Sequence, residues 1–244
     1  MQRISRTATR AALVLAAALS LLIAVGQPAS AHGYGSERTY RVTVTNLTSG
    51  QYLTPPLVAA HRGGFRAFRV GHRASPEIRQ IAENGNLDPA VATWGAHPRV
   101  SDVVAAGGPV GPGASATIEF SATRHEARRV SLASMLICSN DGFSGVNRLR
   151  LPRHVGATNS AYAFGFDAGT EINTEDFADI VPPCPALSGV PTTDSGSGMS
   201  DPALAEGGRI RHHGGVVGGD DLQPEVHGWN PAHAVIAVSV ERIG

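Results

Sequence analysis

Residues 130–138 read VSLASMLIC, an almost unbroken apolar run of strand length. A half-buried strand alternates polar and apolar residues, whereas a continuous run of this kind is typical of a central strand covered on both faces. The chain has 29 Gly, 16 Pro and only 16% charged residues among its 244, which favours many turns over long helices. We therefore expect residues 130–138 to lie in the middle of a sheet.

Other stretches on either side of this run predict partner strands. Tyr and Val alternate with Arg and Thr near residue 40, which is the period of a half-buried strand. Tyr162, Phe164 and Phe166 alternate with small residues and are expected to share one face of a strand. The partner strands are expected at residues 40–45, 117–120, 161–166 and 234–240. Strands separated by Gly, Pro, Asn and Asp turns indicate an all-β antiparallel sandwich or a barrel.

Two short helices and one long loop interrupt the strands. Residues 75–77 (Ser-Pro-Glu) supply an N-cap, a proline at the first helical position and an acid in the first turn, and Gly85 ends this helix. A second helix begins at Asp88-Pro89 and runs to about Trp94. Residues 182–231 are rich in Gly, Pro, Ser and Asp and are expected to form a long loop across the sheet surface. Its middle, residues 194–202, is a candidate for disorder.

Residues 1–31 have the pattern of a secretory signal peptide. Three arginines precede a 15-residue apolar stretch at residues 11–25, and a small-x-small cleavage site follows at residues 29–31. Fifteen apolar residues are too few to span a bilayer, so an uncleaved membrane anchor is the weaker alternative. Cleavage would leave residues 32–244 as a secreted or cell-surface chain with no further transmembrane segment.

The charge balance gives no reason to expect nucleic acid as a partner. All 20 basic residues are arginine, and they match the 20 acidic residues in number. The chain without residues 1–31 has 17 Arg and a formal charge of −3, whereas nucleic-acid-binding domains are usually basic. Arginine as the only base, together with abundant Ala and Gly, is typical of a GC-rich bacterial genome.

Cys138 and Cys184 are the only cysteines in the chain. In an exported protein two cysteines are expected to form a disulfide. This bridge would close a loop of about 47 residues, which chain-entropy arithmetic values at roughly 4 kcal/mol. Two buried free thiols are the alternative, since the pair lacks the C-x-x-C spacing of redox and zinc sites.

Acidic residues follow two of the expected strands within that loop. Asp141 comes directly after residues 130–138, and Asp167 and Glu171 come after the aromatic run. Calcium takes six to eight oxygen ligands at about 2.3–2.6 Å. In an extended strand Asp167 and Glu171 would lie roughly 13 Å apart, so a shared ion requires a turn at Gly169. From spacing alone, ordinary turn residues remain the stronger interpretation.

Six stretches that cover nearly all of residues 32–244 carry a family resemblance. They are YRVTVTNLTSG at 40–50, PPLV at 55–58, SLASMLIC at 131–138, DGFSGV at 141–146, YAFGFDAGT at 162–170 and GWNP at 228–231. Together they resemble the spondin domain of F-spondin and mindin, which also occurs in many exported bacterial proteins. The resemblance implies one antiparallel β-sandwich, similar to the lipid- and calcium-binding sandwiches.

The resemblance also implies a calcium site in the loops at one end of the sandwich. By motif, the expected ligands are Asp141, Asp167 and Glu171. Glu171 departs from the animal members, which have Asp at this position, and Asn147 stands where relatives often have an acid. The animal members serve matrix and cell-surface recognition, so the resemblance further implies a binding or adhesion module.

Two other groups of residues could bind ligands. Histidines of the Gly-rich region could hold zinc or copper, although solvated loop histidines are the stronger interpretation. These are His212, His213, His227 and His233. A basic run near Phe65 and Phe68 could bind an acidic polysaccharide, although arginines on opposite strand faces, paired with acids, are the stronger interpretation. This run is Arg62, Arg66, Arg69 and Arg73.

The sequence therefore favours an exported, non-enzymatic module that binds an extracellular protein or polysaccharide and carries a disulfide and a calcium ion. A secreted hydrolase is the main alternative. The chain has no G-x-S-x-G motif, and GFSG at residues 142–145 lacks one residue of that spacing. A transition-metal binder that uses the loop histidines is the third possibility.

Overall fold

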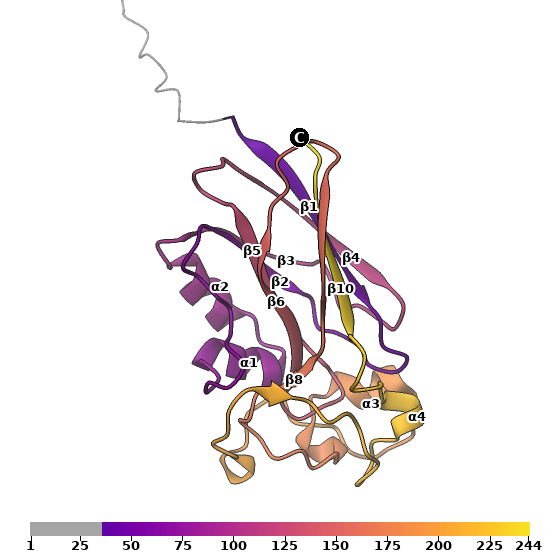
Figure 1. Cartoon of the computed structure of the whole chain (residues 1–244). Helices are drawn as coiled ribbons and strands as arrows, with labels where there is room; N and C mark the ends of the chain where they lie inside the picture. Colours follow the sequence, from indigo (N-terminus) through magenta and orange to yellow (C-terminus); the bar gives the residue numbers. More distant parts are fainter. Residues whose placement is uncertain (1–35) are drawn as a thin grey trace, which may run out of the picture. The chain divides into compact units, whose positions relative to one another are not determined.

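Two antiparallel sheets face each other in the computed structural model, which describes residues 36–244 (Figure 1). The first sheet has the order β4-β1-β10-β7, with β1 at Arg38–Asn46, β4 at Ser115–Ala122, β7 at Thr158–Ala163 and β10 at Ile236–Arg242. The second has the order β3-β2-β5-β6-β8-β9, with β2 at Leu57–His61, β3 at Val100–Ala105, β5 at Arg129–Met135, β6 at Gly142–Arg150, β8 at Gly165–Asp167 and β9 at Arg211–His212. The expected all-β sandwich is confirmed. The expected signal peptide lies outside the described residues.

Strand β5 is the central strand that its apolar sequence predicted. It pairs with β2 on one side and with β6 on the other. Val130 and Leu132 enter the core between the two sheets, whereas Ala133 joins a second cluster on the outer face of its own sheet. Met135 belongs to a third cluster, next to Cys138. Both faces of β5 are therefore covered.

Two helices, both expected from the sequence, cover the outer face of the second sheet. Helix α1 (Pro76–Asn84) begins at Ser75, whose side chain accepts from the Ile78 amide, and ends at Gly85 in the left-handed conformation. Helix α2 (Asp88–Gly95) follows it. Apolar side chains of both helices pack against the sheet; they are Ile78, Ile81, Ala90 and Trp94, in contact with a cluster that includes Leu57 and Phe143.

The long loop contains more regular structure than its composition predicted. It holds helix α3 (Pro183–Ser188), a 3₁₀ turn (Pro202–Leu204), strand β9 and helix α4 (Pro224–His227), after an earlier 3₁₀ turn at Phe177–Asp179. Residues 194–202 are held in place, since the Ser197 amide donates to the Ile180 carbonyl at 2.8 Å and the Ser200 hydroxyl contacts Glu83. No helix in residues 36–244 combines the length and hydrophobicity needed to cross a membrane.

Residues 161–166 do not form one strand, contrary to the prediction. The chain leaves the first sheet at the end of β7 and joins the second sheet at β8. Tyr162 is consequently 71% exposed, while Phe166 packs against the cluster beneath the helices. The crossing passes close to Trp229. A Cβ atom added at Gly165 would lie only 3.2 Å from the indole ring of Trp229. A change of sheet cannot be read from an alternating pattern, which continues across it.

A disulfide joins Cys138 and Cys184, as predicted, with the two Cα atoms 5.1 Å apart. It connects the end of β5 to helix α3. The buried side chain of Gln51 reinforces this junction: it accepts from the Cys138 amide at 3.0 Å and donates to the carbonyls of Cys138 (2.6 Å) and His227 (2.8 Å). The long loop is therefore anchored at two points to the end of the central strand.

Replacing Gln51 by leucine should destabilise the protein even with the disulfide intact. Gln51→Leu leaves the buried polar groups of Cys138 and the His227 carbonyl without their partner, and we expect a loss of about 2–3 kcal/mol in the free energy of unfolding. Urea unfolding under oxidising conditions measures this. Gln223→Leu, at an exposed position whose side chain has no such role, is the matched control and should change little. Equal stability of the two variants would contradict the anchoring role of Gln51.

Candidate functional site

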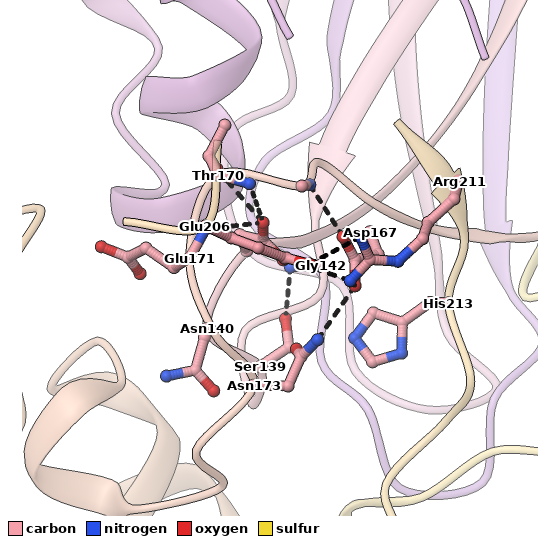
Figure 2. A network of polar contacts seen from close by, with 12 residues as sticks. Ser139, Asn140, Gly142, Asp167, Thr170, Glu171, Asn173, Glu206, Arg211 and His213 are labelled. Atoms are coloured by element: carbon pink, nitrogen blue, oxygen red, sulfur yellow. Dashed lines mark hydrogen bonds and ion pairs between the residues drawn. The ribbon is translucent and has the colours of Figure 1, made fainter. Parts of the chain in front are cut away.

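Two loops meet at one end of the second sheet and bring Asp141 and Asp167 together. Figure 2 shows the polar contacts around Asp167. Asp141 ends the turn between β5 and β6, and Asp167 pairs directly with Gly142 across β6 and β8. The turn is tight because the Ser139 hydroxyl accepts from the Gly142 amide at 3.0 Å, and a side chain at Gly142 would collide with Ser139. The Asp-Gly sequence therefore places the Asp141 carboxylate at the strand end, next to that of Asp167.

Asp141 is completely buried, and one of its carboxylate oxygens has no partner within the described residues. Its Oδ2 accepts from the amides of Thr170 (2.7 Å) and Glu171 (3.0 Å). Its Oδ1 is the oxygen without a hydrogen bond. Burial, followed by the nearby charge of Asp167, raises the pKa of Asp141 to about 6. A buried acceptor of this kind is costly unless a donor or cation reaches it.

Asp167 is held by three donors. Its Oδ1 accepts from the Gly169 amide at 2.7 Å, and its Oδ2 accepts from Asn173 Nδ2 and Arg211 Nη2, each at 2.9 Å. Gly169 has φ +69°, and any side chain there would meet the backbone of Arg209. The turn at Gly169 that a shared ion requires is therefore present, and only glycine fits it.

Glu206 and Arg211 complete this group from the long loop, and sequence reasoning missed both. One carboxylate oxygen each from Asp141, Asp167 and Glu206 lie within 4.8 Å of one another. Arg211 joins the set because its Nη1 donates to Glu206 at 2.8 Å, in addition to the bond to Asp167. The Glu206 amide bonds the Thr170 carbonyl and so fixes the loop alongside the aspartates. Neither residue belongs to a sequence motif that could have indicated this position.

The carboxylate of Glu171 does not join the two aspartates, although its backbone amide bonds Asp141. Its Oε1 instead accepts from the Asp201 amide at 3.1 Å, and Figure 2 shows the side chain directed away from Asp167. Burial, followed by the charge of Glu83, raises the pKa of Glu171 to about 7. The turn at Gly169 is present, but it does not bring the Glu171 carboxylate into the group with Asp141 and Asp167 that the motif implied.

Asn147 lies outside the acidic loops. It occupies the middle of β6, where its side chain accepts from the Ala67 amide at 2.8 Å and donates to the Phe68 carbonyl at 3.1 Å. Asn147 therefore holds the segment that follows β2 against the sheet. An amide serves this purpose better than an acid because the site needs both a donor and an acceptor.

The four loop histidines do not assemble into one site. His213 is buried against Trp229, with ring centroids 4.9 Å apart, and His227 is buried against Phe177. His212 and His233 are exposed. Within residues 36–244, none of the groups of possible metal ligands contains more than one of these histidines. The group with His227 otherwise consists of the two disulfide-bonded sulfurs, which are not free to bind a metal.

The acidic group suits a divalent cation with oxygen ligands. Asp141, Asp167 and Glu206 offer carboxylate oxygens, and Arg211 balances only one of the three charges when all are ionised. Calcium prefers carboxylates, carbonyls and water at irregular geometry, and loop backbone lies close by. The unpartnered Asp141 Oδ1 is the atom that such a cation would satisfy. The residues present therefore fit the calcium ion that the family resemblance implies.

The chain that carries this acidic group matches a model of a protein family. The family model described as Spondin_N matches residues 38–176, which is more than half of the chain and runs from β1 past Glu171. The match includes Asp141 and Asp167 but ends before Glu206 and Arg211. No curated protein matches the chain. The sandwich, the motifs around the two aspartates and this match lead to one conclusion: the chain belongs to the Spondin_N family.

Proposed function

We propose that this protein is an extracellular, non-enzymatic binding or adhesion module in which calcium links the two acidic loops. The Spondin_N family consists of extracellular modules of the binding and adhesion type. The Cys138–Cys184 disulfide fits an oxidising compartment outside the cytosol. An extracellular space also supplies the millimolar calcium at which extracellular modules bind this ion.

The observation that carries the proposal is the unpartnered Oδ1 of Asp141. A fully buried, unpaired carboxylate oxygen is unfavourable, and its neighbours Asp167 and Glu206 repel its charge. Calcium bound to these oxygens would remove the repulsion and join the β5–β6 turn, the loop after β8 and the long loop. The ion would thus act as a structural cross-link that makes the loop surface rigid for recognition.

Calcium should therefore raise the melting temperature by several degrees. A ligand that binds only the folded state adds about 2.7 kcal/mol at a hundredfold excess over its Kd. In a domain of this size each kcal/mol raises the Tm by about 2–4 °C. Magnesium should have a smaller effect because it prefers a tighter octahedron and keeps its waters. Asp141→Asn and Asp167→Asn should each lose most of the rise.

Asp194→Asn is the control for this experiment. Asp194 is the exposed member of a separate acidic group with the half-buried Asp176 and Asp221, so this variant tests whether the rise comes from that group instead. It should keep the full rise. Identical melting of the wild-type protein in millimolar calcium and in chelator would contradict the calcium part of the proposal and leave the sandwich unaffected.

Arg211 provides a second test, because it neutralises Asp167 where a cation would also act. Arg211→Gln removes a 2.9 Å ion pair from a buried carboxylate, so the variant should melt at a lower temperature than wild type in chelator. Added calcium should restore much of this loss, which makes the calcium-induced rise larger than in wild type. Arg209→Gln, a neighbouring exposed arginine without an acidic partner in the described chain, should show the wild-type rise. Equal rises in all three proteins would count against a cation at this site.

A further inference from the structure

The end of the sandwich opposite the acidic loops carries a concentration of arginine. Strands β5 and β6 run between the two ends: Asp141 lies in the turn that joins them, whereas Arg129 and Arg150 lie at their far ends. A pocket of about 310 Å³ opens at this far end. Six arginines line it: Arg38, Arg124, Arg128, Arg129, Arg150 and Arg153.

No acidic side chain of the described residues neutralises this pocket. None of the residues that line it is acidic, and the ion pairs found in residues 36–244 use other arginines, namely Arg41, Arg79 and Arg211. Glu126 lies in the same connection between β4 and β5, but its carboxylate accepts from the Thr123 amide and does not line the pocket. The Nε of Arg38 is buried and has no hydrogen-bond partner among the described residues. The pocket therefore lacks a counter-charge from this part of the chain.

The backbone holds these like charges close together. Arg129 and Arg150 are direct partners across β5 and β6, a pairing that destabilises a sheet. Arg148, next to them at an irregularity of the same strand pair, has φ +61°, which a residue other than glycine rarely adopts. Burial and the charges of Arg148 and Arg150 lower the pKa of Arg129. An arrangement that is unfavourable by itself is expected where an anionic ligand compensates for it.

Two adjoining hollows extend the positive surface beyond the pocket. One shares Arg128 with the pocket and adds Arg62 and Arg99. The other shares Arg129 and Arg150 with the pocket and adds Arg148. No acid lines either hollow. The arginines thus follow a continuous surface, and their planar guanidinium groups suit sulfate, phosphate and carboxylate oxygens.

We propose that this arginine end binds an anionic polysaccharide, with one anionic group in the pocket and neighbouring groups on the two hollows. Repeated anions along a chain match the row of hollows better than one small anion does. A single-stranded nucleic acid would need exposed aromatic rings for its bases, and Tyr40, the aromatic residue that lines the pocket, is only 2% exposed. The site lies apart from the acidic loops and does not depend on calcium.

The structure also divides the basic run that the sequence indicated. Residues 62–73 are not a strand, and Arg66 and Arg69 form no ion pair within the described residues, so the expected pairing with acids is wrong. Arg62 belongs to the arginine end, whereas Arg66 and Arg69 line a separate hollow with Asn147. The two groups therefore offer a test and a matched control within one protein.

Binding of the purified protein to dextran sulfate tests the proposal, with unsulfated dextran of the same length as the neutral control. We expect binding to dextran sulfate alone, weakening as salt rises and unchanged by chelator. The double variant Arg124→Gln/Arg128→Gln should weaken binding by about tenfold or more, since charge-assisted contacts are lost. Arg66→Gln/Arg69→Gln removes the same charge and should weaken it by less than about twofold. Thermal melting confirms that both variants are folded.

Three results would overturn the proposal. The first is no binding to dextran sulfate at low salt. The second is an equal loss in the two double variants, which would indicate attraction by overall charge. The third is tighter binding of a single-stranded DNA of matched length and charge, which would identify the surface as a nucleic-acid site. Because binding is measured in chelator, the outcome is independent of the calcium-dependent melting that tests the proposed function.

Discussion

The burial of β5 on both faces is the constraint on which the rest of this structure depends. One face of the strand packs into the core between the sheets, and the other packs beneath helices α1 and α2. Such a strand cannot shift its register without exposing apolar side chains or burying polar ones. Its two ends are therefore fixed, and each end carries one group of charged residues: Asp141 follows one end, and Arg129 begins the other.

This constraint explains how a chain with no formal net charge develops two ends of opposite character. The two aspartates at one end are buried and accept from backbone amides, whereas the arginines at the other end line open hollows. Net charge describes long-range attraction and solubility, and it conceals a separation of charge within the molecule. A formal net charge of zero gives no reason to expect nucleic acid as a partner, but it does not exclude an anionic ligand at the arginine end.

The acidic end is stabilised by parts of the chain far apart in sequence. The disulfide and Gln51 attach the long loop to the end of β5, and the same loop delivers Glu206 and Arg211 to Asp167. A carboxylate as buried as Asp141 persists only where the surrounding structure holds it. The covalent anchor, the buried amide side chain and the guanidinium group thus serve one purpose, which is to keep several loops in one arrangement around the aspartates.

The sequence by itself determined the central strand, helices α1 and α2, the disulfide and two of the three acids at the candidate site. These features are local: an apolar run, a Ser-Pro-Glu cap or an Asp-Gly turn acts through neighbours a few residues away. Only the tertiary structure decided that the chain changes sheets near Gly165, that Glu206 replaces Glu171 beside the aspartates, and that arginines from strand ends and loops gather at one end. Contacts between loops have no sequence period, because each loop follows its own turns and meets the others only after the sheets have packed.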